Sequence, residues 1–217
     1  MKSSSRLSSI VRPEKTDLRR EAGQRTRDDL LAATLELLAQ RGQEGVTLRE
    51  ITQSAGANVA AVSYHFGSLK ALCDVAIEHA LERYLDAQIR ELDALPGSAT
   101  LSELAEAFAR PMLSALVAGG PDLAVIRTVA RVGIDPPEGW ERLAGKFEQA
   151  RRQAVRVLAA NLPEVDEREL VFRVRCAAGM LNWLAVAPIG AELGAEPAER
   201  VERMLIPVVA GALQGVR

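Results

Sequence analysis

The clearest pattern of apolar and polar positions lies between residues 46 and 70, VTLREITQSAGANVAAVSYHFGSLK. Thr47 and Glu50 have the Thr-x-x-Glu spacing of a capping box, in which two side chains satisfy free backbone donors at a helix start. Apolar residues then recur at intervals of three and four, which predicts a short helix with one apolar face: Leu48, Ile51 and Ala55.

A second short helix is expected directly after this one. Gly56 permits the positive φ that ends a helix and turns the chain. Asn58 is a good cap for the next helix, whose inward side is formed by Val59 and Val62, and Gly67 ends it. Two helices this short bury little on their own, so the pattern predicts a helix-turn-helix on a supporting helix.

The outer side of the second helix is small, polar and aromatic, with Ala60, Ala61, Ser63, Tyr64 and His65. Small side chains let a helix approach a DNA groove closely, and the polar ones can reach bases or phosphates. The alternative is a helical hairpin within an ordinary core. The local pattern leaves both interpretations open.

The rest of the chain also has helical periodicity, with Gly and Pro clusters as breaks. The pattern predicts an all-α protein of about nine helices and no strand. The fourth helix is too long for a small head and is expected to link the head to a helical body. The expected helices span about 26–41, 47–55, 58–66, 69–94, 100–117, 122–132, 138–160, 166–186 and 196–214.

Charge divides the chain unequally. Residues 1–72 have 11 Lys and Arg against 8 Asp and Glu, a net charge of +3, while the remainder has 16 against 21, a net of −5. Residues 1–27 alone have 8 basic and 3 acidic residues. A basic end on an acidic body suits a protein that meets a polyanion with one face. We expect a flexible basic arm at 1–24, a DNA-binding domain at 25–72 and a helical domain at 73–217. The arm either contacts DNA or is a disordered tail.

Several classes of protein are disfavoured. Two histidines and two cysteines, Cys73 and Cys176, form neither a disulfide framework nor a metal site, and there is no glycine-rich phosphate loop. We therefore expect no enzyme activity and no cofactor. No apolar run of about 18 residues appears, so we expect no membrane segment and a cytoplasmic location.

Residues 26–72 closely resemble the N-terminal DNA-binding domain of the TetR family of bacterial transcriptional repressors. The matching motifs are AATLELLAQRG, VTLREITQSAG and NVAAVSYHFGS, followed by a long connecting helix. The later segments LVFRVRCAAGMLNWL and RVERMLIPVVAGAL are loosely similar to the branch that includes fatty-acid-responsive regulators. The resemblance implies a three-helix head, a linking helix and a helical domain for ligand binding and dimerisation.

The resemblance also implies which residues contact DNA. Two positions depart from the family pattern: Leu69 replaces a common lysine, with Lys70 one place later, and Ser63 stands where many members have tyrosine. A shift of one residue rotates a side chain by about 100° around a helix. The implied contacts are Thr47, Arg49, Asn58, Ala60, Ala61, Ser63, Tyr64, His65, Ser68 and Lys70.

The family further implies a homodimer on a palindromic operator, released by a small, largely apolar effector of acyl or aromatic type. The alternative is a DNA-binding regulator controlled by a protein partner. The expected dimer interface comprises Cys176, Ala177, Gly179, Met204, Leu205, Val208, Val209 and Leu213. The expected ligand pocket comprises His79, Phe108, Met112, Arg127, Arg131, Phe147, Asn182 and Trp183. Further candidates are Ala76, Tyr84, Leu104, Ile126, Val129 and Arg152.

Overall fold

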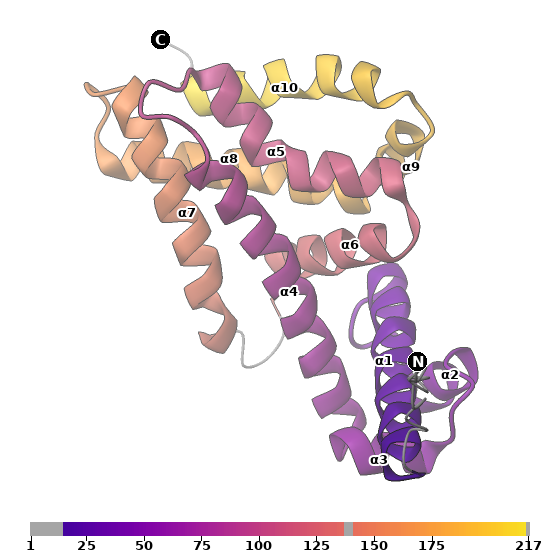
Figure 1. Cartoon of the computed structure of the whole chain (residues 1–217). Helices are drawn as coiled ribbons and strands as arrows, with labels where there is room; N and C mark the ends of the chain where they lie inside the picture. The colour runs from indigo at the N-terminus through magenta and orange to yellow at the C-terminus, as the bar shows by residue number, and fades with distance from the viewer. Residues whose placement is uncertain (1–14, 137–140, 216–217) are drawn as a thin grey trace, which may run out of the picture.

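The computed structural model describes residues 15–136 and 141–215, and the side chains of all of these except 15–17 and 141–143. This part of the chain contains ten helices and no strand, which confirms the predicted all-α class with one helix more than the nine expected (Figure 1). The helices are α1 (Lys15–Arg41), α2 (Leu48–Ser54), α3 (Val59–Phe66), α4 (Leu69–Asp93), α5 (Leu101–Ala118), α6 (Gly120–Ile134), α7 (Glu141–Asn161), α8 (Glu167–Val186), α9 (Pro188–Gly194) and α10 (Ala198–Gln214).

The first three helices form a small head at one end of the molecule, and α4 runs from this head into a larger helical body (Figure 1). The head core is made of side chains from α1, α2, α3 and the first turns of α4. Leu30, Ile51, Val62 and Leu72 are among its fully buried members. These are the apolar positions that recur at helical spacing in the sequence.

The head core is continuous with the adjoining part of the body. Val125, Val129 and Val132 of α6 belong to the same buried cluster as the core residues of the head. A second cluster is formed mainly by α5, α8 and α10, together with residues of α4, α6, α7 and α9. Helix α6 therefore packs directly between the head and the rest of the body, where it crosses above the end of α1 (Figure 1).

One predicted boundary is wrong, and one helix was not predicted. Helix α1 begins at Lys15, so residues 15–24 are helical rather than a flexible arm, and residues 1–14 lie outside the described residues. The apolar stripe begins only at Leu30, and hydrophobic periodicity therefore could not reveal the polar helical turns before it. The helix that was not predicted is α9, although Pro188 stands at its first position, a preferred place for proline.

Candidate nucleic-acid interface

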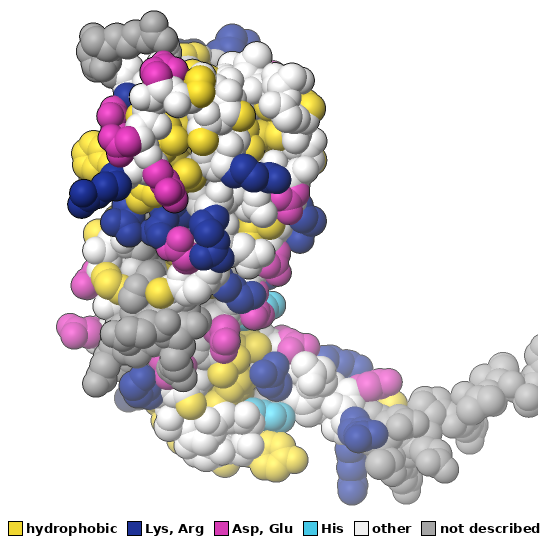
Figure 2. All heavy atoms as spheres, turned by 90° about the vertical axis from the view of Figure 1, so that its left-hand side faces the viewer, with side chains coloured by type: hydrophobic (Ala, Val, Ile, Leu, Met, Phe, Trp, Pro, Cys, Tyr) yellow, Lys and Arg dark blue, Asp and Glu magenta, His cyan; other side chains and the backbone are white. Residues whose placement is uncertain are grey.

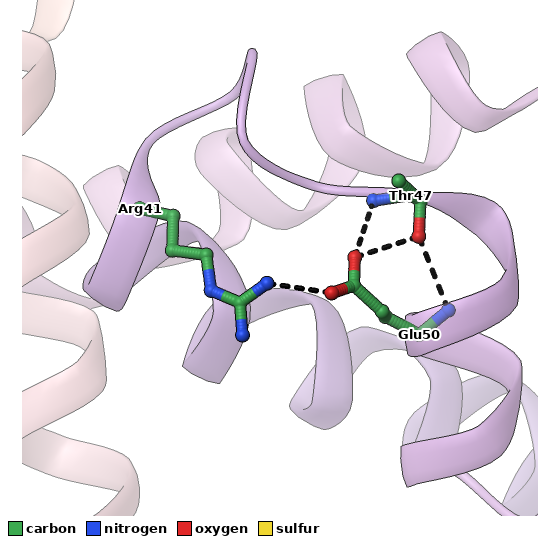
Figure 3. Close-up of polar contacts among 3 residues, drawn as sticks. All are labelled: Arg41, Thr47 and Glu50. Atoms are coloured by element: carbon green, nitrogen blue, oxygen red, sulfur yellow. Dashed lines mark hydrogen bonds and ion pairs between the residues drawn. The ribbon is translucent and has the colours of Figure 1, made fainter.

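The start of α2 is held by the predicted capping box. The Thr47 hydroxyl donates to Glu50 Oε2 at 2.6 Å and accepts from the Glu50 amide at 3.4 Å, and the Thr47 amide donates to the same carboxylate at 3.2 Å. Arg41, at the end of α1, donates to Glu50 Oε1 at 2.6 Å (Figure 3). Hydrogen bonds from Thr47, followed by that from Arg41, lower the pKa of the Glu50 carboxyl. This network joins α1 to α2.

Caps and glycines also position α3 and the start of α4. The Asn58 side chain accepts from the Ala61 amide at 2.9 Å, and the Ser68 hydroxyl accepts from the Ala71 amide at 3.1 Å. Gly67 has a φ of +81°, a value that suits glycine, and separates the two helices. The predicted cap at Asn58 and the predicted helix end at Gly67 are therefore present, and with the cap at Ser68 they set the direction in which α4 leaves the head.

The outer face of α3 is open to solvent. Val59, Ala60, Ser63 and Tyr64 are exposed, and Tyr64 is 84% exposed although it is aromatic. Val62, on the opposite face, is fully buried in the head core. A short helix with its inner side fixed and a small, polar and aromatic outer side is suited to entering a major groove.

Most, but not all, of the residues predicted to contact DNA are exposed. Eight of them are exposed: Thr47, Arg49, Asn58, Ala60, Ser63, Tyr64, Ser68 and Lys70. Ala61 is half-buried and packs against the head core, so its methyl group faces inward. His65 is also half-buried; its ring meets that of Tyr64 edge-on at 4.9 Å between centroids. Sequence reasoning did not include Val59, which was placed on the inward side but is 51% exposed.

Besides the caps Asn58 and Ser68, two more of the exposed residues, Thr47 and Lys70, have intramolecular side-chain partners. The Thr47 hydroxyl uses its single hydrogen in the bond to Glu50. Lys70 Nζ lies 3.1 Å from Asp74 Oδ2, and Lys70 lines a groove between the head and the end of α6. The one-residue shift from the usual lysine position therefore leaves this ammonium group in an ion pair on α4.

Hydrogen bonds join the head to α6. Arg131 Nε donates to the Ala39 carbonyl at 3.0 Å, and Arg131 Nη2 donates to the Gln40 carbonyl at 2.9 Å. One turn earlier, the Thr128 hydroxyl lies 3.5 Å from the Leu35 carbonyl. The last turns of a helix have carbonyls without helical partners, and α6 supplies donors to two of them. A movement of α6 would therefore change these hydrogen bonds at the end of α1.

The body has a cavity of about 320 Å³ between α4, α5 and α6. Ion pairs lie at its edge: Arg83 Nη2 to Asp122 Oδ1 at 2.7 Å, and Arg110 Nε to Glu91 Oε2 at 3.0 Å. Its lining consists of Arg83, Tyr84, Ala87, Glu91, Arg110, Pro111, Ser114, Ala115, Ala118, Asp122, Val125 and Ile126.

Tyr84 is the most deeply placed polar group of this lining. Its hydroxyl accepts a hydrogen bond from Gln88 Nε2 at 3.2 Å, and the same amide group donates to the Phe108 carbonyl at 3.1 Å. Burial raises the pKa of Tyr84 to about 12, so the phenol is neutral at physiological pH and keeps its hydrogen.

None of the eight residues predicted for the pocket lines this cavity. Of the six further candidates, Tyr84 and Ile126 line it and the other four do not. Phe108 and Met112 are buried in the body core, and Phe147 is half-buried against the head core. His79 is exposed on α4, and Trp183 is 56% exposed on α8. Arg127 donates to the Ala185 carbonyl, Arg131 bonds to α1, and Asn182 packs against Gly133. Periodicity identifies apolar faces but does not reveal where two such faces leave a gap.

The expected dimer residues fall into two groups. Cys176, Gly179, Met204 and Val208 are exposed, whereas Ala177, Leu205, Val209 and Leu213 are buried in the core of their own chain. The buried four are therefore unavailable to a partner, which corrects the prediction. The apolar residues missed on the exposed side are Phe172 and Trp183.

Charges on the body face formed by α4 and α7 are largely mixed in sign, with Lys and Arg next to Asp and Glu (Figure 2). Lys146 Nζ pairs with Glu82 at 3.1 Å and Arg156 Nη2 with Asp93 at 3.6 Å, both between α7 and α4. Within residues 15–136 and 141–215, no cluster of three His, Cys, Asp or Glu side chains is arranged to hold a metal. No single helix of that part is long and apolar enough to cross a membrane; α8 and α9 reach that length and composition only as a pair bent by 80°.

A helix-turn-helix head joined by a long helix to a helical body defines the protein as a DNA-binding regulator of the helix-turn-helix class. The sequence profile described as "Bacterial regulatory proteins, tetR family" matches residues 30–75, and that described as "Tetracyclin repressor-like, C-terminal domain" matches residues 106–212. The chain belongs to the TetR family of DNA-binding transcriptional regulators. A comparison with curated proteins found no match.

Solved structures of transcriptional regulators, among them one of the TetR family, share the fold. PfmR from Thermus thermophilus superposes with a TM-score of 0.62 at 19% identity, covering 88% of this chain and 97% of that one. The ketosteroid regulator KstR2 of Mycobacterium tuberculosis gives 0.60 at 19% identity, with 85% and 93% covered. A regulator from Saccharomonospora viridis in complex with choline gives 0.60 at 18% identity, with 88% and 96% covered.

Proposed function

We propose that the protein is a homodimeric repressor that binds a palindromic operator through α3 and is released by a small, largely apolar ligand. The observation that supports this most directly is the outer face of α3. It is exposed, is rich in small and polar side chains, and is held in place by caps at Asn58 and Ser68. The contacts with bases are assigned to α3 itself, and those with phosphates to Arg49 and the start of α4.

The dimer is proposed to form through the outer faces of α8 and α10. On α8, Phe172, Cys176, Gly179 and Trp183 are exposed and recur at steps of four, three and four residues. On α10, Met204, Val208 and Gly211 are exposed at steps of four and three. Exposed apolar side chains gathered along one face are typical of a protein contact. Two helices from each chain would form a four-helix bundle with two-fold symmetry, and the two heads would then read equivalent half-sites.

The ligand is proposed to enter the cavity between α4, α5 and α6. Its volume of about 320 Å³ lies at the lower end of the range for small-molecule sites. The apolar part of the lining and the neutral hydroxyl of Tyr84 favour an uncharged acyl or aromatic compound with a carbonyl or ether oxygen. The choline complex of the regulator from Saccharomonospora viridis is an instance of a small molecule bound by a protein of this fold.

The proposed response passes through α6. Val125 and Ile126 line the cavity, and Arg131, about one and a half turns further along the helix, bonds to the end of α1. A ligand that favours another position of α6 would shift the population towards a different placement of the head. Operator release then follows from the loss of the spacing at which both heads reach their half-sites.

Selection from a random library of DNA duplexes tests the DNA part of this proposal. The full-length protein should enrich one sequence with two inverted half-sites about one helical turn apart. Binding should weaken with added salt because phosphate contacts release counterions. Enrichment of a single unrepeated site would contradict the dimeric mode of binding, and failure to enrich any duplex would contradict operator recognition itself.

Thermal-shift screening of the purified protein tests the ligand part. Acyl compounds, aromatic carbonyl compounds and, for comparison, choline should be tried separately, since a bound ligand raises the melting temperature by mass action. A compound of the first two classes should stabilise the protein and weaken the operator complex. If none does so, control by a protein partner becomes the better explanation of how the regulator is released.

A further inference from the structure

The first turns of α1 extend beyond the compact head. The buried stripe of α1 begins at Leu30, yet the helix starts at Lys15, and residues 18–29 are all exposed or half-buried. Leu18 is 50% exposed. In Figure 2 this segment projects sideways from the lower end of the molecule, with Lys or Arg side chains along it. It is therefore a helical extension with little core to stabilise.

The extension packs against α3, the helix proposed to enter the groove. A Cβ placed on Gly23 would lie 3.9 Å from His65 Cε1, and the Arg27 guanidinium carbon lies 5.3 Å from the centroid of the Phe66 ring. An arginine over an aromatic face is attracted by the ring. The side of α1 that includes Gly23 and Arg27 thus faces the last turn of α3.

Helix geometry places two arginines on this same side. At 100° per residue, Arg19 lies about 40° and Arg20 about 60° from the direction of Gly23, displaced by about 6 Å and about 4.5 Å along the axis. Glu21 and Arg25 lie roughly opposite, and they pair with each other at 3.9 Å. Arg19 and Arg20 are exposed, and no ion pair joins either of them to another residue whose side chain is described.

We propose that Arg19 and Arg20 bind backbone phosphates of the DNA duplex beside the half-site that α3 occupies. This inference rests on the proposed function, because it assumes that α3 enters the groove. Two guanidinium groups that continue the α3-facing side of α1 are placed to meet the phosphate backbone at the end of the recognition helix. Residues 1–27, with 8 basic and 3 acidic side chains, provide a field of the required sign. The extension adds affinity without reading sequence.

The test compares the full-length parent with the double variant Arg19→Ala/Arg20→Ala on the duplex enriched by selection. Each phosphate contact contributes about 0.9 to the slope of log K against log salt. The double variant should lose roughly 1.8 of that slope per head and bind at least about 10-fold more weakly at low salt. The ratio of affinities for the enriched duplex and a scrambled duplex should stay the same, because phosphate contacts are not specific.

The matched control is Glu21→Ala/Arg25→Ala, which changes the opposite side of the same turns. It should retain the salt slope of the parent, and Arg19→Lys/Arg20→Lys should restore most of the slope lost by the alanine variant. Ethylation interference should identify phosphates that are required by the parent and not by Arg19→Ala/Arg20→Ala. Equal slopes for parent and double variant would overturn the inference, as would an equal loss in the control. A parent that binds no duplex would instead overturn the proposed function.

Discussion

The outer face of α3 and the outer faces of α8 and α10 are both open to solvent, but their chemistry differs. On α3 the exposed residues are mainly small and polar, with one aromatic ring, Tyr64. On α8 and α10 they are largely apolar, with Phe172 65% and Trp183 56% exposed. Water solvates the first face well and the second poorly. The first is therefore suited to a polar, charged partner such as DNA, and the second to another protein surface.

The largest expected effect comes from placing charge on the apolar face. Trp183→Glu/Val208→Glu should convert the dimer to a monomer, because burying two carboxylates per chain in an interface is strongly unfavourable. Operator affinity should fall by about 100-fold or more, since two linked heads bind far more tightly than one. Light scattering after size exclusion and a gel shift measure the two effects.

Leu18→Glu is the control for this variant, because Leu18 is similarly exposed but lies on the extension of α1. It should remain dimeric. A dimer that survives the substitutions at Trp183 and Val208 would show that the apolar face of the body has another role.

A smaller effect is expected from the polar face. Tyr64→Ala should weaken operator binding by about 1–3 kcal/mol, or roughly 5- to 150-fold. The free energy of unfolding should change by less than about 0.5 kcal/mol because the ring is exposed. Removing both Tyr64 and His65 should abolish the complex in a gel shift.

Lys70→Ala provides the comparison on the head, because the Lys70 ammonium is paired with Asp74. It should lose less operator affinity than Tyr64→Ala. The assignment of the reading face to α3 fails if Tyr64→Ala binds as tightly as the parent.

The connection between the head and the body can be tested at Arg131. Arg131→Met removes two hydrogen bonds to the end of α1 and should lower the free energy of unfolding by about 1–3 kcal/mol. It should also reduce the effect of a bound ligand on operator affinity. Arg127→Met is the control, because Arg127 donates within the body, to the Ala185 carbonyl at 3.3 Å.

Urea denaturation and operator binding with and without ligand measure these changes. Arg127→Met could reduce the effect of the ligand on operator affinity as much as Arg131→Met does. In that case the contact between Arg131 and α1 does not transmit the effect of the ligand from the body to the head.

The smallest expected effect is on the pH dependence of stability, and it concerns two capping boxes, one in the head and one in the body. Hydrogen bonds from Thr47 and Arg41 lower the pKa of Glu50, and those from the Thr100 backbone and side chain lower the pKa of Glu103. A carboxyl whose pKa is lower in the folded state stabilises the protein above its unfolded pKa of about 4.3. That stabilisation is lost as pH falls through the folded pKa.

Glu50→Gln and Glu103→Gln should each therefore reduce the dependence of the melting temperature on pH below about pH 4.5. Only Glu50→Gln should also weaken operator binding slightly, because Glu50 supports Thr47 at the start of α2. Equal operator affinity for the parent, Glu50→Gln and Glu103→Gln would show that the start of α2 makes no DNA contact that depends on the hydrogen bonds of Glu50.

Much of the head could be predicted from residues close together in the chain. The capping box of Thr47 and Glu50, the cap at Asn58 and the glycine at position 67 act within about four residues, and the structure confirms each of them. The early start of α1 could not be predicted in the same way. The turns before Leu30 bury no apolar face, so hydrophobic periodicity is absent there.

The outward side of each body helix depended on neighbours distant in the sequence. Periodicity places Leu205 and Val208 on an apolar helix, but only packing against α5 and α8 buries Leu205 and leaves Val208 exposed. The position of the cavity was decided in the same way, because it is space left by the arrangement of three helices. The sequence by itself determined the helices, their caps and the turn of the head, since these depend on local backbone bonding. Tertiary structure alone decided the partner faces, the cavity and the bond from Arg131 to α1, since each requires segments far apart in the chain to meet.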